Sequence, residues 1–165
     1  MILTAQEEYG IRCAVTLARA QREGHDYLTL NQIAEAEGLT NPYAGKVVRL
    51  LVQAGLVEST RGRLGGYSLA RPAGEVSVAE TLHALGTKFY DGEICQRPSG
   101  EHSLCIHNPE CSLRAFWGGL QRLIDDYVDR TKLSDLLGGE TAMRNSLAEV
   151  RQAVAAVPTT EDPRS

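Results

Sequence analysis

The chain has 165 residues, of which 42% are hydrophobic and 23% charged, so it can bury a core as one medium domain or as a small domain with an extension. No apolar run approaches the roughly 20 residues that cross a membrane, and no secretory signal pattern opens the sequence, so we expect a cytoplasmic protein without a membrane partner. The net charge of −4 argues against a chain coated in positive charge.

Positive charge is nevertheless concentrated in one segment. Residues 40–71 carry five basic side chains and one acidic side chain, whereas the segments before and after are net negative. The basic residues are Lys46, Arg49, Arg61, Arg63 and Arg71. A local cluster of this kind is what a binding face for a polyanion requires.

The N-terminal half predicts three helices. Thr4 and Glu7 form an S/T-x-x-E capping box, and a helix over 5–22 should follow it. A short helix over 30–37 is expected to end at the glycine that comes next. Thr40 or Asn41 can cap a third helix, which reaches about residue 53.

The following segments alternate between hairpin, helix and loop. Two short β-type stretches flank the Arg- and Gly-rich connection at 61–66 and predict a hairpin. Residues 78–85 predict a helix, and apolar residues at steps of three and four predict a strongly amphipathic helix over 112–130. A weaker Ala-rich helix is expected within 138–157, followed by a disordered tail at 158–165.

This order of elements is that of a winged helix–turn–helix. We therefore expect a mainly α fold with a small β-hairpin wing and a long dimerisation helix. Residues 1–85 would form the DNA-binding domain, 86–111 a cysteine-rich loop, and 112–137 the dimerisation helix with the segment after it.

The chemistry of the third helix and the wing suits duplex DNA. Polar side chains at the start of the helix can reach base edges in the major groove, and basic side chains can neutralise phosphates. The predicted contacts are Thr40, Asn41, Tyr43, Lys46, Arg49, Arg61, Gly62 and Arg63. Gly62 leaves room for a close approach to a backbone or a minor groove. A small helical domain with a merely solvated arginine loop is the alternative interpretation.

Three of the four cysteines lie within residues 95–111, a stretch without helical or strand periodicity. They are Cys95, Cys105 and Cys111. In a reducing cytosol, clustered cysteines favour metal or redox chemistry over disulfides. Thiolates are the ligands of iron–sulfur clusters, although three cysteines with a histidine could instead close a zinc site. Cys13, in the middle of the first predicted helix, is expected to be a small core residue.

These features together resemble the IscR- and NsrR-type winged-helix regulators, members of the Rrf-type iron–sulfur family, over about residues 1–137. The resemblance rests on Leu3-Thr4 with Tyr9, on 39–43, on the motif that runs from Leu50 through the hairpin to Leu69, and on a three-cysteine loop followed by a helix that contains Trp117. It implies a homodimer on operator DNA, with contacts from the start of the recognition helix and from the wing. By position these contacts are Pro42, Tyr43, Arg61 and Gly62.

The resemblance also implies that Cys95, Cys105 and Cys111 bind a 2Fe–2S or 4Fe–4S cluster. The gaps between them hold nine and five residues, whereas the family usually has five in each. A histidine that some members use as the fourth ligand is replaced here by Arg114, which cannot ligate. The fourth ligand is therefore expected to be Glu8 of the partner subunit, with His107 and His102 as alternatives.

The apolar stripe of the 112–130 helix is expected to pair two subunits, although packing within one subunit would give the same stripe. Its members are Leu113, Phe116, Trp117, Leu120, Leu123, Ile124 and Tyr127. The chain is thus interpreted as a regulator that senses redox state, nitric oxide or iron–sulfur status. A winged-helix regulator with structural zinc or direct thiol sensing is the alternative. An enzyme is not expected, because the sequence has no nucleophile–base constellation, no phosphate-binding glycine loop and no C-x-x-C motif.

Overall fold

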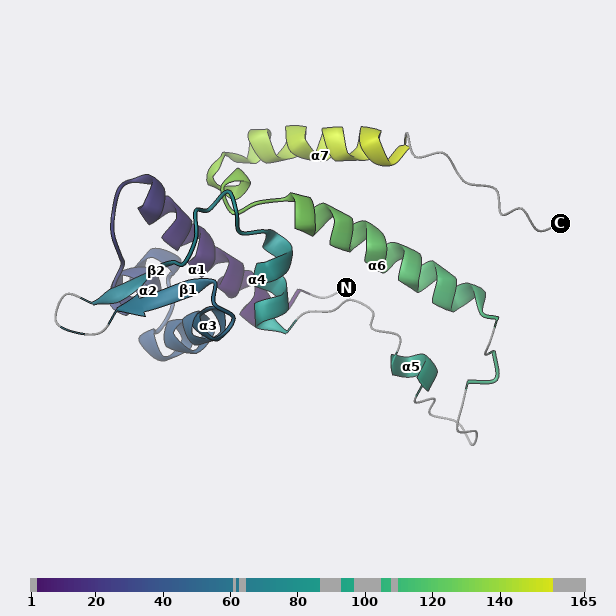
Figure 1. The fold of residues 1–165 in the computed structure, drawn as a ribbon, viewed down its shortest axis with the longest axis horizontal. Coiled ribbons are helices and arrows are strands. Elements are labelled where there is room, and N and C mark those ends of the chain that lie inside the picture. Colours follow the sequence, from purple (N-terminus) through teal and green to yellow (C-terminus); the bar gives the residue numbers. More distant parts are fainter. Residues whose placement is uncertain are drawn as a thin grey trace.

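The computed structural model describes residues 3–60, 62, 65–86, 93–96, 105–107 and 110–155. Arg61, Arg63, His102 and the predicted tail at 158–165 lie outside these residues. Figure 1 shows the N-terminal helices gathered together with a small hairpin at their edge, and the longer C-terminal helices extending away from them. The predicted mainly α fold with a β-hairpin wing is confirmed.

Helix α1 (Ala5–Arg22) lies at the centre of the winged domain and packs against α2, α3, α4 and β2. The predicted capping box is present: the backbone N–H of Thr4 donates to Glu7 Oε2 at 2.7 Å, and that of Glu7 donates to Thr4 Oγ1 at 3.3 Å. These two bonds satisfy N–H groups that have no partner within the helix. Leu17 is 1% exposed on the face that α1 turns toward its neighbours.

Helices α2 (Leu30–Glu37) and α3 (Asn41–Gln53) form the helix–turn–helix. The turn is possible because Gly38 adopts a left-handed conformation with φ of 65°. Helix α3 buries Ala44, Val47, Val48 and Leu51 against the domain core. Complete burial of one large aliphatic side chain contributes about 1.5–3 kcal/mol, so this face is what holds α3 in place.

Strands β1 (Val57–Thr60) and β2 (Gly66–Leu69) form the predicted antiparallel wing, paired from Val57 with Leu69 to Thr60 with Gly66. An additional bridge joins the wing to the connection between α1 and α2. In this bridge Leu28 N–H donates to the Tyr67 carbonyl at 2.9 Å, and Tyr67 N–H donates to the Leu28 carbonyl at 2.8 Å. The hairpin is therefore attached to the helical core along one edge.

Helix α4 (Val78–Leu85) packs directly on α1. A Cβ atom at Gly10 would lie 2.3 Å from Leu85 Cδ1, so the absence of a side chain at this position allows the close approach. Gln6 Nε2 also donates to the Leu85 carbonyl at 2.9 Å, which satisfies a carbonyl at the end of α4.

The end of helix α6 (Ser112–Arg130) is joined to the start of α4. Val78 N–H donates to the Thr131 carbonyl at 2.9 Å, and Leu133 N–H donates to the Val76 carbonyl at 3.0 Å. Leu133 is fully buried in the core, whereas none of residues 112–130 is. The rest of α6 extends away from the winged domain in Figure 1.

Three elements surround α6 in sequence. The four-residue helix α5 (Glu93–Gln96) lies partly within the stretch predicted to lack periodicity. The sequence did not predict it, because one helical turn is too short to produce a periodic pattern. After α6 come the 3₁₀ turn η1 (Asp135–Leu137) and helix α7 (Glu140–Ala155), the expected C-terminal helix. Within the described parts of the chain, no helix combines the length and hydropathy that crossing a bilayer demands.

Gly66→Ala tests the attachment of the wing to the core. A Cβ atom at Gly66 would lie 2.6 Å from both the Leu28 carbonyl oxygen and Tyr27 Cδ2, so we expect the free energy of unfolding to fall by about 1–3 kcal/mol. Gly139→Ala is the matched control, because a Cβ atom there meets nothing within 4 Å. Urea unfolding followed by circular dichroism measures both, and equal stability of the two variants would contradict the packing described.

Candidate nucleic-acid interface and cysteine loop

Helix α3 divides into a buried face and an exposed face. The predicted contacts Thr40, Asn41, Pro42, Lys46 and Arg49 are all exposed, on the side away from the core. Thr40 is the N-cap residue but makes no side-chain cap hydrogen bond, contrary to the usual behaviour of a threonine there. The first turn of α3 therefore presents uncapped N–H groups and a hydroxyl to an incoming anion.

Tyr43 is only partly exposed, because its ring packs edge-on against Tyr9 of α1. The ring centroids are 5.9 Å apart with an interplanar angle of 88°. Such an edge-to-face pair is the arrangement that aromatic rings prefer. Tyr43 therefore has a structural contact in addition to the DNA contact predicted for it.

An ion pair between α1 and the end of α2 lies beside these rings. Arg12 Nε donates to Glu37 Oε2 at 2.6 Å, and Thr16 Oγ1 donates to the other carboxylate oxygen. The hydrogen bond and the charge of Glu37 raise the pKa of Arg12 above its ordinary value. Arg12 also lies 5.2 Å from the centroid of the Tyr9 ring. Local sequence patterns did not predict this group, because its residues are too far apart in the chain for such patterns to connect them.

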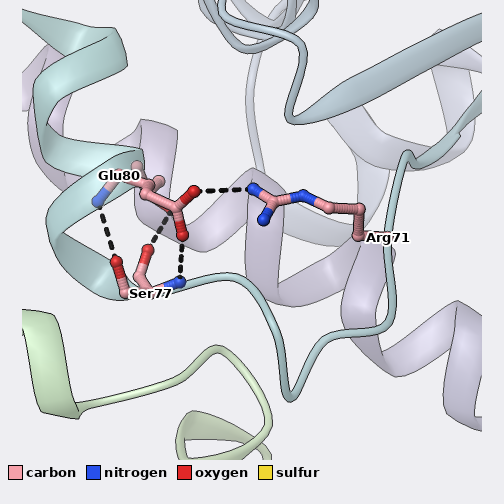
Figure 2. A network of polar contacts seen from close by, with 4 residues as sticks. Arg71, Ser77 and Glu80 are labelled. Carbon is pink, nitrogen blue, oxygen red and sulfur yellow. Dashed lines mark hydrogen bonds and ion pairs between the residues drawn. The ribbon is translucent and has the colours of Figure 1, made fainter.

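The wing carries the other predicted contacts. Gly62 is exposed, and its φ of 115° is one that side-chain-bearing residues rarely adopt. Arg61 and Arg63 lie outside the described residues, so their predicted roles stay predictions. Arg71, the fifth basic residue of the cluster, forms an ion pair with Glu80 of α4 at 2.6 Å, as Figure 2 shows.

Cys95 lies in α5, Cys105 in the loop, and Cys111 immediately before α6. All three are partly exposed, and the four cysteines of the chain form no disulfide among themselves. Among the described residues, no three histidine, cysteine or acidic side chains lie close enough together to hold a metal ion. The described part of the chain thus provides thiols of suitable chemistry but does not assemble them into a site.

Cys13 differs from these cysteines in its burial. It is completely buried in the core, as expected, and its burial raises the pKa of the thiol to about 11. A thiol is a nucleophile and a metal ligand only when it is deprotonated, so Cys13 is chemically inert at neutral pH.

The candidates for the fourth ligand are exposed where the structure describes them. Glu8 lies in the first turn of α1 with its side chain in solvent, and its backbone N–H donates to the Thr4 carbonyl at 3.0 Å. His107 is also exposed, whereas His102 lies outside the described residues. An exposed Glu8 is accessible to a second molecule.

The apolar stripe of α6 is exposed along most of its length. Leu113 is 63% exposed, Phe116 60%, Leu123 51% and Trp117 39%, while Leu120, Ile124 and Tyr127 are partly buried. The rings of Phe116 and Trp117 pack against each other with centroids 4.9 Å apart. Neighbouring large apolar side chains exposed in this way are typical of an interaction surface.

Residues 3–139 match the family model described as Rrf2, an iron-dependent transcriptional regulator. The chain belongs to the Rrf2 family. The protein is therefore a DNA-binding transcriptional regulator, and its IscR relatives are regulators rather than enzymes.

Individual relatives are similar to this protein over most of its length. The transcriptional regulator IscR of Cereibacter sphaeroides is 29% identical over 140 residues, which cover 85% of this chain and 89% of that protein. The solved structure of T. potens IscR is 27% identical, with a TM-score of 0.63 over 83% of this chain and 86% of that one. CymR, the global cysteine regulator of B. subtilis, is 25% identical, with a TM-score of 0.63 over 83% of this chain and 96% of that one.

Proposed function

We propose that the protein is a homodimeric, cytoplasmic transcriptional regulator that binds operator DNA through α3 and the wing, under the control of an iron–sulfur cluster in the cysteine loop. The observation that carries the proposal is the two-sided form of α3. Its apolar face is locked into the core, while its uncapped N-terminus and basic side chains face solvent.

The proposed DNA contacts divide by chemistry. Thr40 and Asn41 would reach base edges or phosphates from the start of the helix, and Pro42 and Tyr43 would shape that approach. Lys46 and Arg49, further along the helix, would neutralise phosphates, as would Arg61 and Arg63 beside Gly62 in the wing. Because contacts with α1 hold Tyr43 of α3 and Glu37 of α2 in place, α3 would bind DNA as a preformed element.

The cluster assignment is supported by the donor chemistry and by the similarity to IscR proteins. Cys95, Cys105 and Cys111 would hold the cluster as thiolates, with the partner subunit's Glu8 as the fourth ligand and His107 or His102 as alternatives. When bound, the cluster supplies an iron centre that responds to oxidants, nitric oxide or the supply of clusters. A carboxylate ligand would leave one iron more open to exchange than a fourth thiolate would.

The dimer assignment is supported by the exposed stripe on α6. Two copies of α6 packed along this stripe would cover Leu113, Phe116, Trp117 and Leu123, which a single chain leaves in solvent. The same pairing would place two recognition helices on one DNA duplex, as a symmetric operator requires.

Arg49→Ala tests the DNA face. Arg49 is exposed, so its replacement should leave stability unchanged but weaken binding to a duplex selected by the unaltered protein from a random-sequence pool. The slope of log affinity against log salt should become shallower by about 0.9 for each phosphate that is no longer neutralised. Arg144→Ala, on the exposed ion pair of α7, is the control. Equal slopes for the two variants, measured by fluorescence anisotropy, would overturn the proposed role of Arg49.

The cluster is tested by purification without oxygen, followed by absorption spectroscopy and counts of iron and sulfide. We expect coloured protein with both elements, and Cys105→Ser should lose them. Glu8→Ala should bleach faster in air, whereas Glu140→Ala, another exposed acid in a first helical turn, should not. Colourless protein with stoichiometric zinc would overturn the cluster in favour of a structural zinc site, and equal bleaching of the two variants would remove Glu8 as a ligand.

Phe116→Asp tests the dimer. An acidic side chain in the stripe would be buried by pairing, so we expect a shift toward monomer in light scattering coupled to gel filtration. Ala115→Asp is the matched control, because Ala115 is exposed on the same helix but lies outside the stripe. Unaltered protein that elutes as a monomer, or an equal shift for both variants, would contradict the assignment of this face.

A further inference from the structure

Among the basic residues of the 40–71 segment that the structure describes, Arg71 is the one whose side chain forms an ion pair. Its guanidinium Nη2 lies 2.6 Å from Glu80 Oε1, and each side chain is 40% exposed (Figure 2). Arg71 follows the end of β2 by two residues, and Glu80 lies in the first turn of α4. The pair therefore connects the exit of the wing to the start of α4.

The Glu80 carboxylate has a second role at the same place. Its Oε2 accepts the Ser77 backbone N–H at 2.9 Å, and Glu80 N–H donates to Ser77 Oγ at 3.1 Å, which completes the capping box of α4. The Ser77 N–H, and then Arg71, lower the pKa of Glu80 below its ordinary value. One ionised carboxylate thus serves both the helix cap and the wing.

The backbone between the wing and α4 is held by α1 and by the start of the hairpin as well. Ala70 N–H donates to the Leu56 carbonyl at 3.0 Å. Gln21 of α1 reaches the segment twice, since its Nε2 donates to the Arg71 carbonyl at 3.3 Å and its Oε1 accepts Ala73 N–H at 2.9 Å.

The other side of the segment meets the chain that leaves α6. Ser134 N–H donates to the Ala73 carbonyl at 3.2 Å, and Leu133 N–H donates to the Val76 carbonyl at 3.0 Å. Val78 N–H donates to the Thr131 carbonyl at 2.9 Å. Residues 70–78 are thus the place where the wing, α1, α4 and the end of α6 are joined by hydrogen bonds.

We infer that residues 70–78 together with Glu80 form a joint that sets the position of the wing relative to the end of α6, with Arg71 and Glu80 as its positioning residues. The inference rests on the proposed wing contacts with DNA. A displacement of α6 would move the wing through the contacts of this joint, without first moving the recognition helix α3. Arg71 would then support DNA binding from a place where it touches no DNA.

Glu80→Gln tests the joint. Glutamine at this position still accepts the Ser77 N–H, so the cap of α4 is kept, but its neutral amide no longer pairs with Arg71. We expect weaker binding to the duplex selected from a random pool by the unaltered protein, and a salt slope that is shallower by about 0.9 for each phosphate that the wing no longer neutralises. The thermal unfolding midpoint should match that of Glu140→Gln, which removes the exposed Glu140–Arg144 pair of the same 2.6 Å distance.

A double-mutant cycle separates the pair from its members. Arg71→Gln should reduce the salt slope as Glu80→Gln does, and the double variant should bind no more weakly than either single variant, because each change breaks the same interaction. Additive effects would mean that Arg71 contacts phosphate itself, which overturns the inference. Arg71→Gln also leaves the cap of α4 untouched, so the test stands even if Glu80→Gln fails to fold.

Replacement of the wing arginines distinguishes failure of the proposed joint from failure of the proposed wing contacts with DNA. If Arg63→Ala reduces the salt slope and Glu80→Gln does not, the wing contacts DNA but the joint does not position it, and this inference is overturned alone. If Arg61→Ala and Arg63→Ala both leave the slope unchanged while the protein still binds DNA, the proposed wing contacts fail and the inference fails with them.

Discussion

Burial of the apolar face of α1 is the constraint on which the rest of the structure depends. Helix α1 packs against α2, α3, α4 and β2, and its Leu17 and Cys13 are buried in the core, so each of these elements takes its position from one helix. Gly10 allows α4 to pack closely on α1, because a Cβ atom at this position would clash with Leu85. Close packing leaves few alternative arrangements, and the exposed side of α3 is consequently oriented by contacts made on its opposite side.

Polar interactions at the edges of this core fix what apolar packing leaves adjustable. The Arg12–Glu37 pair joins α1 to the end of α2, and the Arg71–Glu80 pair joins the wing to α4. Hydrophobic contact is non-directional, whereas a charged hydrogen bond requires particular atoms at particular distances. The winged domain therefore combines a general attraction with a few directional links, a suitable arrangement for a surface that must match the spacing of phosphates on DNA.

The long helix and the cysteine loop follow a different principle. Helix α6 is attached to the domain at one end, and Phe116 and Leu123 stay exposed in the single chain. The three thiols of the loop are likewise not brought together within the described residues. Under the proposed function a second α6 would cover the stripe and a cluster would bring the thiolates together, so both features would be completed from outside the single chain.

The sequence by itself determined the features that depend on neighbouring residues. Thr4 with Glu7 marked the start of α1, the three- and four-residue steps marked α6, and the position of Cys13 within an apolar pattern placed it in the core. The Rrf2 resemblance likewise came from motifs that can be read along the chain. The tertiary structure alone decided the Tyr9–Tyr43 contact, the bridge between Leu28 and Tyr67 of the wing, and the ion pair of Arg71 with Glu80. Helical and strand periodicities record which face of an element is buried, but they do not record which residue of another element that face will meet.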